Sequence, residues 1–340
     1  MIGDLCDPRV TFGEAVARVA ETDDRVVVLS ADSGRSSGFG AFAEQRPDRY
    51  LEFGIQEHGV TGVASGLATA GWKPVFCAIA PFVTCRNFEA FRNDIGYMRQ
   101  NVKIVGRNGG FTYSDLGATH HSLEDYAIIR MIPGVTILAP QDPGEIRGAV
   151  AAMLAHDGPV YMRLGSAPQP ELFGSDDFVI GKARRARSGS DLTVVTTGYV
   201  APQVLAAADA VRADGVGVDL LCLGTVAPLD DEAIIESALK TGHVVTVEEH
   251  YERGGLGGSV SELLAGVEGV VVERIAIPHG YVPSGPYDEL LAAYGLDAAG
   301  IERQLRSAVV ARSFRTFASE RARPARRAGA RNTRRPPQQE

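Results

Sequence analysis

The chain has 340 residues, of which 45% are hydrophobic and 22% charged, and its formal net charge is −8. This length suggests two domains of ordinary size, and the apolar fraction suffices for a substantial buried core. Residues 311–340 carry nine Arg and two Glu, a charge of +7 that leaves −15 on residues 1–310. A body this acidic argues against nucleic acid as a substrate, and no run approaches the roughly 18 apolar residues that a membrane span needs.

The cysteines lack C-x-x-C spacing and lie mostly in apolar runs, so the sequence predicts neither a zinc site nor a disulfide framework. We expect reduced, buried thiols at these positions, which are Cys6, Cys77, Cys85 and Cys222. The N-terminus, Met-Ile-Gly-Asp-Leu-Cys-Asp, has neither a basic region nor an apolar targeting segment. We therefore expect a cytoplasmic protein.

Short β-branched runs alternate with helical patterns through the first half of the chain. The expected strands are residues 25–29, 74–79, 102–105, 135–138 and 160–163. Strands separated by helices pair in parallel, with helices on both faces of the sheet. We predict an α/β fold whose first domain, residues 1–165, is a doubly wound, mostly parallel sheet.

A polar, basic segment over residues 166–190 has the turn residues of a linker. A second alternation follows, with expected strands at residues 192–196, 218–222, 243–247 and 270–274 and helices at 201–213 and 232–240. It predicts a smaller α/β domain over residues 191–310. Residues 311–340, rich in Arg, Ala and Pro, have the composition of a disordered basic tail. Such a tail is either a solvated extension or a contact for nucleic acid or an acidic partner.

Two glycine-rich loops call for comparison with nucleotide-binding motifs. Residues 38–43 match G-x-G-x-x-A, but the preceding strand ends near Leu29, whereas that motif turns directly from strand into helix. Residues 254–259 follow an expected strand and open a helix, so their amides could hold an anion. Close packing of strand and helix explains these glycines better. Neither loop is followed by the Gly-Lys-Ser/Thr of a phosphate-binding loop.

Residues 51–67 place one carboxylate, Glu57, at the start of a helix that is otherwise small and apolar. Apolar residues recur at helical spacing from Val60 to Leu67, so this helix buries a face. A buried acid costs free energy unless something bonds to it. On the local pattern alone, Glu57 either caps the helix, where the dipole tolerates negative charge, or binds a group that needs a carboxylate.

An acid followed by His58 at the start of a glycine-rich helix resembles the signature of transketolase and its relatives. Further motifs follow in the order of that family: the loop of Phe82, the loop of Thr119 and His120, and then Pro-Gln-Asp-Pro-Gly-Glu at residues 140–145. The resemblance runs from about residue 8 to residue 308. It implies the pyrimidine-binding and C-terminal domains of that family.

The resemblance also implies two catalytic residues. The acid of this family, here Glu57, hydrogen-bonds N1′ of the aminopyrimidine of thiamine diphosphate and so promotes removal of the thiazolium C2 proton. His120 matches a histidine that donates a hydrogen bond to the oxygen that becomes anionic, or shuttles its proton. His121 has no such match and is interpreted as support.

Three residues are expected to bind the cofactor. Phe82 matches an aromatic residue that stacks on the aminopyrimidine, Asp32 matches an aspartate near the thiazolium, and Ile79 lies in the strand that leads to Phe82. An ordinary core position for Phe82 and a turn or capping role for Asp32 are the alternatives.

The resemblance suggests a phosphate site for the acceptor sugar at Arg9, Ser36 and Arg163, and Arg suits this role because it can donate bidentately. Asn108 stands where typical transketolases have His, and Leu116 where they have Asp. Both family residues contact hydroxyls of the sugar donor. We therefore expect Asn108 to bind substrate, while the identity of the donor stays open.

The resemblance does not include the diphosphate-binding domain, whose Gly-Asp-Gly and Asn hold Mg²⁺ on the phosphates of the cofactor. We expect no metal site in this chain, and an N-terminal transketolase-like subunit that supplies the magnesium in an α2β2 heterotetramer. The expected function is the C-terminal subunit of a split transketolase, which moves a two-carbon ketol unit between sugar phosphates or related aldehydes. The alternatives are the β subunit of a 2-oxoacid dehydrogenase or another decarboxylating thiamine enzyme, and a non-catalytic paralogue that only binds a partner.

Overall fold

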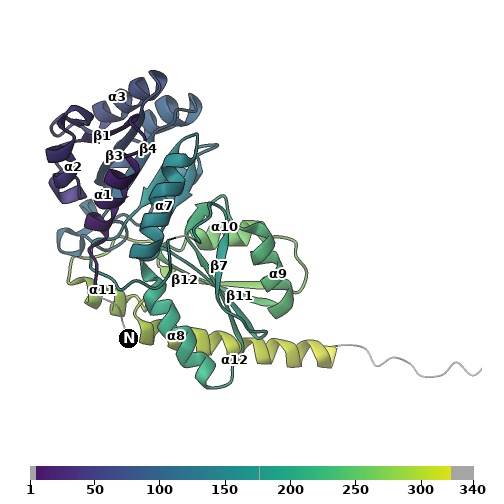
Figure 1. Ribbon diagram of the computed structural model, residues 1–340. Helices are drawn as coiled ribbons and strands as arrows, with labels where there is room; N and C mark the ends of the chain where they lie inside the picture. The colour runs from purple at the N-terminus through teal and green to yellow at the C-terminus, as the bar shows by residue number, and fades with distance from the viewer. Residues whose placement is uncertain (1–4, 176, 323–340) are drawn as a thin grey trace, which may run out of the picture.

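The computed structural model describes residues 5–175 and 177–322, which form two α/β domains side by side (Figure 1). The two-domain, mostly parallel α/β fold predicted from the sequence is confirmed. No helix within the described ranges is long and apolar enough to cross a membrane.

The first domain is built on a seven-stranded sheet with the order β10-β5-β6-β4-β3-β1-β2. Its strands are β1 (Val26–Ser30), β2 (Tyr50–Glu52), β3 (Lys73–Ile79), β4 (Lys103–Arg107), β5 (Thr136–Leu138), β6 (Val160–Arg163) and β10 (Thr225–Ala227). All neighbours pair in parallel except β10 and β5, which are antiparallel. Strands β1 and β3 to β6 confirm the predicted strands to within two residues at either end.

Helices cover both faces of this sheet because its strands are apolar on both sides. The main covering helices are α1 (Pro8–Val19), α3 (Glu57–Thr69), α6 (Asp125–Arg130) and α7 (Pro143–Ala155). Helices α1 and α7 pack on one face around Phe12 and Met153, whereas α3 and α6 pack on the other around Val60 and Ile129. Shorter segments are α2 (Gly40–Gln45), α4 (Ala80–Val83), α5 (Phe88–Ala90), a π-helix at Phe91–Tyr97 and 3-10 turns at Arg35–Ser37, Pro47–Arg49, Ser114–Thr119 and Gly198–Val200.

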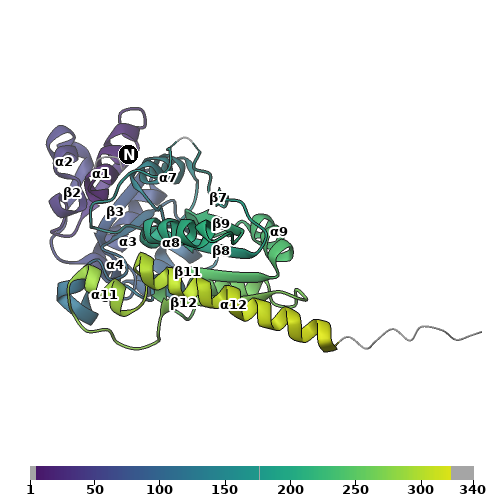
Figure 2. The same ribbon diagram turned by 90° about the horizontal axis from the view of Figure 1, so that it is seen from below.

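The second domain is a five-stranded sheet with the order β12-β11-β8-β9-β7. Its strands are β7 (Ala183–Arg187), β8 (Leu192–Thr197), β9 (Val218–Leu223), β11 (His243–Tyr251) and β12 (Val271–Ile277). Its helices are α8 (Ala201–Ala213), α9 (Asp231–Thr241), α10 (Leu256–Leu263), α11 (Tyr287–Ala293) and α12 (Ala298–Ala322). Seen from below, α12 runs beside α8 along this sheet (Figure 2), and the two helices share a buried cluster that contains Val204 and Ile301.

Strand β7 lies within the predicted linker, residues 166–190, so that prediction is wrong for residues 183–187. The strand pairs antiparallel with β9 at the edge of the sheet. Its arginines reach acidic side chains: Arg185 Nε lies 3.4 Å from Asp219 Oδ1, and Arg187 Nε donates to Asp209 Oδ1 at 2.7 Å. Charged side chains are common on edge strands, which is why this strand has the composition of a linker.

Two further predictions need adjustment. Helix α12 continues to Ala322 and so enters the predicted tail, residues 311–340, the rest of which lies outside the described residues. Among the thiols, Cys77 and Cys222 are buried as expected, but Cys85 is exposed because it follows the short helix α4 at the surface.

Candidate functional site

Helix α3 begins at Glu57, and the side chain of this acid is buried, with 5% of the residue exposed. Its carboxylate does not cap the helix. Instead, Glu57 Oε2 accepts a hydrogen bond of 2.8 Å from Nη1 of Arg86, a residue that the sequence reasoning missed. The buried charge is therefore balanced by a guanidinium whose side chain is 46% exposed.

Arg86 also covers the ring of Phe82. The guanidinium carbon lies 4.0 Å from the centroid of that half-buried ring, a distance at which a cation is attracted to an aromatic face. Phe82 belongs to α4, which follows directly from β3. Arg86 lies in the turn that follows α4, so no helical spacing in the sequence indicated that it would lie over Phe82.

His120 completes this cluster. Its ring meets the Phe82 ring edge-on at 5.3 Å between centroids and the Tyr113 ring at 5.5 Å. Thr119 Oγ1 lies 2.9 Å from His120 Nδ1 and fixes the imidazole on the other side. Burial, and then the charge of Arg86, lowers the pKa of His120, so the imidazole is neutral at neutral pH.

The predicted catalytic residues Glu57 and His120 and the predicted cofactor residue Phe82 are therefore brought together, with Arg86 between them. Ile79 ends β3 immediately before α4 and is partly buried. Asp32 follows β1 and is exposed, and its amide donates to Glu52 Oε1 at 2.7 Å. Hydrogen bonds, ion pairs and ring contacts among the described residues do not link Asp32 to the cluster.

Two non-glycine residues near the carboxyl edge of this sheet have a left-handed backbone. They are Asp32, with a φ of 57°, and Asn108, with a φ of 58°. Such conformations cost free energy and tend to occur where a site requires them. Ligands of open α/β sheets bind at this edge, which is consistent with the sequence-based choice of both residues.

Ser36 and Asn108, both predicted to bind substrate, meet at a second missed residue, Arg107. The Arg107 side chain is buried at the end of β4 and donates to Ser36 Oγ at 3.0 Å, to Ser37 Oγ at 3.1 Å and to Asn108 Oδ1 at 2.7 Å. Ser36 itself is exposed. These residues form a compact polar group at the ends of β1 and β4.

The two arginines that were predicted to bind phosphate, Arg9 and Arg163, have partners of their own. Arg9 donates through Nε and Nη2 to the Asp7 carboxylate at 3.1 and 2.7 Å, at the start of α1. Arg163 is buried, and its Nη2 donates to the carbonyls of Ser122 and Glu249 at 3.2 and 2.7 Å. Arg163 therefore lies in the junction between the domains and lacks the open guanidinium that the prediction required.

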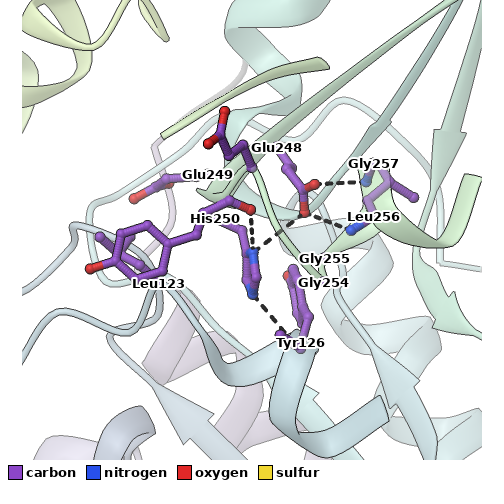
Figure 3. Close-up of polar contacts among 12 residues, drawn as sticks. Leu123, Tyr126, Glu248, Glu249, His250, Gly254, Gly255, Leu256 and Gly257 are labelled. Carbon is purple, nitrogen blue, oxygen red and sulfur yellow. Dashed lines mark hydrogen bonds and ion pairs between the residues drawn. The ribbon is translucent and has the colours of Figure 1, made fainter. Parts of the chain in front are cut away.

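This junction fixes the loop that carries His120. Glu249 of β11 accepts a hydrogen bond from the amide of Phe111 at 2.5 Å and one from the Tyr287 hydroxyl at 3.0 Å. Burial raises the pKa of Glu249. Glu249 lies beside Glu248 and His250 at the end of β11 (Figure 3).

The glycine-rich loop at residues 254–259 does hold an anion, but one from this chain. The Glu248 carboxylate accepts hydrogen bonds of 2.7 Å from the amides of Leu256 and Gly257 at the start of α10 (Figure 3). A Cβ at Gly255 would lie only 2.2 Å from Glu248 Oε2. The glycines let the Glu248 carboxylate pack closely against the amides that bind it. No external ligand is therefore required to explain these glycines.

Among the described residues, no group of three or more His, Cys, Asp or Glu side chains could hold a metal ion. Leu116, which replaces an aspartate of the resembled family, is exposed.

Both domains match known families. Residues 6–167 match the family described as transketolase, pyrimidine binding domain, and residues 181–301 match the family described as transketolase, C-terminal domain. An apulose-4-phosphate transketolase subunit of Phocaeicola vulgatus is 37% identical over 303 residues, which cover 88% of this chain and 97% of that protein. The 6-deoxy-6-sulfo-D-fructose transketolase subunit SqwH of Clostridium sp. is 36% identical and covers 90% of this chain and 96% of that protein.

Longer relatives match over part of their length. The 1-deoxy-D-xylulose-5-phosphate synthase of Syntrophotalea carbinolica is 35% identical over 87% of this chain but only 47% of that protein. A solved structure described as a split gene transketolase, inactive beta4 tetramer, superposes with a TM-score of 0.83 at 33% identity and covers 89% of this chain and 98% of that chain. The chain thus covers nearly all of the two transketolase subunits and of the solved chain, and about half of the synthase.

Proposed function

Since the chain belongs to the transketolase family, we propose that it is the C-terminal subunit of a split transketolase, which moves a two-carbon ketol unit to an aldose or related aldehyde. The observation that carries this proposal is the contact cluster of Glu57, Arg86, Phe82 and His120. It combines a buried carboxylate, an aromatic face and a neutral imidazole at one place. A non-catalytic paralogue would have no need for this combination.

The residues present fit the aminopyrimidine of thiamine diphosphate. The Arg86 guanidinium is flat, donates to the Glu57 carboxylate and lies over the Phe82 ring. A protonated or imino aminopyrimidine is also flat and would make the same two contacts. When bound, thiamine diphosphate supplies a nucleophilic thiazolium carbon. Glu57 would hold the proton at the ring nitrogen N1′, and Phe82, Ile79 and Asp32 would position the cofactor.

His120 would act on the substrate oxygen. Because its pKa is lowered, the neutral imidazole can donate one N–H to an oxygen that gains negative charge, while Thr119 holds the other ring nitrogen. Ser36 and Asn108 would contact the substrate. Arg9 would join them only after release from Asp7, and Arg163 is left out because its guanidinium is engaged in the domain junction.

We further propose that an N-terminal transketolase-like subunit supplies the diphosphate site and its Mg²⁺, in an α2β2 heterotetramer. Support comes from apolar side chains exposed beside the cluster: Ile55 is 75% exposed and Val63 of α3 is 39% exposed. Exposed large apolar residues near a site are typical of an interface.

A cytoplasmic location is part of the proposal. Cys77, Cys85 and Cys222 are free thiols, as is usual where glutathione keeps cysteines reduced.

Co-purification with the N-terminal subunit tests the proposed function. The assembled pair, loaded with thiamine diphosphate and Mg²⁺, is given hydroxypyruvate, a ketose phosphate or pyruvate as rival donors. We expect ketol transfer from one of the first two and none by either subunit alone. Turnover with pyruvate only would favour the decarboxylating alternative, and turnover by the isolated chain would contradict the split site.

A further inference from the structure

We propose that a cavity at the amino-terminal edge of the first sheet binds a small organic anion, in which a carboxylate or phosphate is joined to an apolar body. The cavity has a volume of about 840 Å³, a size typical of small-molecule sites. It lies at the starts of β5 and β6, whereas the cluster around Glu57 and His120 lies beyond the carboxyl ends of β2 and β4. The inference therefore does not rest on the proposed function.

Two arginines that line this cavity, Arg92 and Arg99, have no counter-ion. Both are exposed, and neither side chain makes a hydrogen bond or an ion pair with any residue that the structure describes. One acid, the exposed Asp157, also lines the cavity and is likewise without an ion pair in the described ranges. Burial, and then the charge of Lys103, lowers the pKa of the lining residue His156, which is therefore neutral at neutral pH. The lining thus keeps an excess of positive charge.

A lysine lies behind the wall of the cavity. Lys103, at the start of β4, is fully buried, and its Nζ donates to the carbonyls of the lining residues His156 and Gly158 at 2.9 and 2.7 Å. No carboxylate of the described chain lies within 4.0 Å of this ammonium group. Burial, and then the charge of Lys73, lowers the pKa of Lys103 to about 7. An anion in the cavity would offset this cost of burying a positive charge.

Thr136 supplies a buried hydroxyl that has no partner. This first residue of β5 lines the cavity with only 6% of its surface exposed. Its amide donates to the carbonyl of Pro159 at 3.1 Å, but its hydroxyl makes no hydrogen bond with any described residue. Buried polar side chains are normally hydrogen-bonded. The hydroxyl is therefore available to a polar group of a ligand.

The apolar part of the lining indicates that the ligand is more than a simple ion. Ile132, Pro133 and Pro159 form part of the wall. Two large lining side chains, Tyr97 and Met131, are 86% and 75% exposed. Large apolar side chains exposed around a concave polar site are typical of a surface that binds a ligand. An anion joined to a flat apolar body would contact both kinds of lining residue.

The backbone beside the cavity has two uncommon features. The segment Phe91–Tyr97 is a π-helix, and Arg99, which follows it, has a left-handed backbone with a φ of 53°. Both features are costly and are frequent at functional sites. The wall is also closely packed, since a Cβ at Gly96 would lie only 2.3 Å from Cγ2 of Ile132. The cavity is therefore formed before any ligand binds.

Isothermal titration calorimetry of the full chain tests the inference with phenyl phosphate, benzoate and the neutral benzamide. We expect at least one of the two anions to bind the wild type, and benzamide to bind roughly tenfold more weakly or less. Arg92→Gln combined with Arg99→Gln should weaken anion binding roughly tenfold to a hundredfold. Thr136→Val, which keeps the shape of the side chain and loses the hydroxyl, should weaken it roughly twofold to tenfold. Arg303→Gln, at an exposed position of α12, is the matched control and should bind as the wild type does.

Equal affinity of the anions for the wild type and the double variant would overturn the inference, because the anions would then bind elsewhere on the chain. Equal affinity for benzoate, phenyl phosphate and benzamide would overturn it too, as would the absence of measurable binding by either anion. The melting temperature without ligand should be the same in the double variant, since both arginines are exposed and unpaired. The anion that binds more tightly identifies the charged group of the natural ligand.

Discussion

At the scale of single residues, Arg86 links the two groups on which the proposed chemistry depends. It neutralises the buried carboxylate of Glu57, and its charge is one of the two causes that lower the pKa of His120. A cofactor ring that takes the place of the guanidinium has to break an ion pair that is partly open to solvent. The Arg86 end of the pair is 46% exposed, so the guanidinium can move into solvent when a cofactor ring that also bonds to Glu57 takes its place.

The link between Arg86 and His120 predicts a change in titration. Arg86→Met keeps the length of the side chain but removes the positive charge, which disfavours the imidazolium form. We expect the pKa of His120 to rise toward its usual value, although burial, the larger cause, stays. NMR titration of the His120 ring protons measures this shift.

Arg25→Met is a matched control because Arg25 lies at the opposite end of the first sheet, paired with Asp23. It should leave the His120 midpoint where it is. An unchanged midpoint in Arg86→Met would mean that the two side chains do not interact.

At the scale of elements, β7 and β10 show how the two halves of the chain are joined. Strand β10 comes from the second half of the chain but pairs with β5 in the first sheet, and β7 forms the edge of the second sheet. Between them, Glu145 of α7 accepts a bond of 3.1 Å from the Gln141 amide and lies 3.7 Å from Arg184 of β7. Because this carboxylate is buried where the two domains meet, we expect the stability of the folded protein to depend on pH.

Burial, aided by the charge of Asp142, raises the pKa of Glu145 to about 7. The folded protein therefore holds a proton on Glu145 that the unfolded chain releases near its ordinary pKa of about 4.3. Stability from this group is greatest below that ordinary value and declines as pH rises through 7. For Glu145→Gln, which has no charge to bury, we expect the melting temperature relative to the wild type to rise by roughly 2–4 °C between pH 5 and pH 8. A difference that stays constant over this range would show that Glu145 does not titrate in the folded state.

At the scale of the whole molecule, the sequence predicted the strands and helices whose apolar residues recur at a regular spacing. The buried strands have β-branched runs and Glu57 begins a helix with a clear apolar face, so both were visible in the sequence. Strand β7 was not, because its arginines are paired with acids distant in the chain, and β10 was not, because three residues carry no periodicity.

The residues of the candidate site divide in the same way. Glu57, Phe82 and His120 lie in short motifs, and their mutual contact is a result of the fold. Arg86 and Arg107 belong to no recognisable motif. Only the folded structure shows which side chains surround them. Arg163 shows the opposite case, since this arginine was chosen by its position in the sequence, yet it is buried between the two domains and its Nη2 donates to two carbonyls.

The most direct test of the account replaces Glu57 in the assembled two-subunit enzyme. Glu57→Gln keeps the shape of the side chain but cannot hold a proton as the carboxylate does. We predict that ketol transfer falls roughly 10²- to 10⁴-fold, while assembly and the melting temperature are kept, and that Glu268→Gln, on an exposed turn of the second domain, keeps its full rate. A Glu57→Gln enzyme that turns over at nearly the wild-type rate would contradict the account.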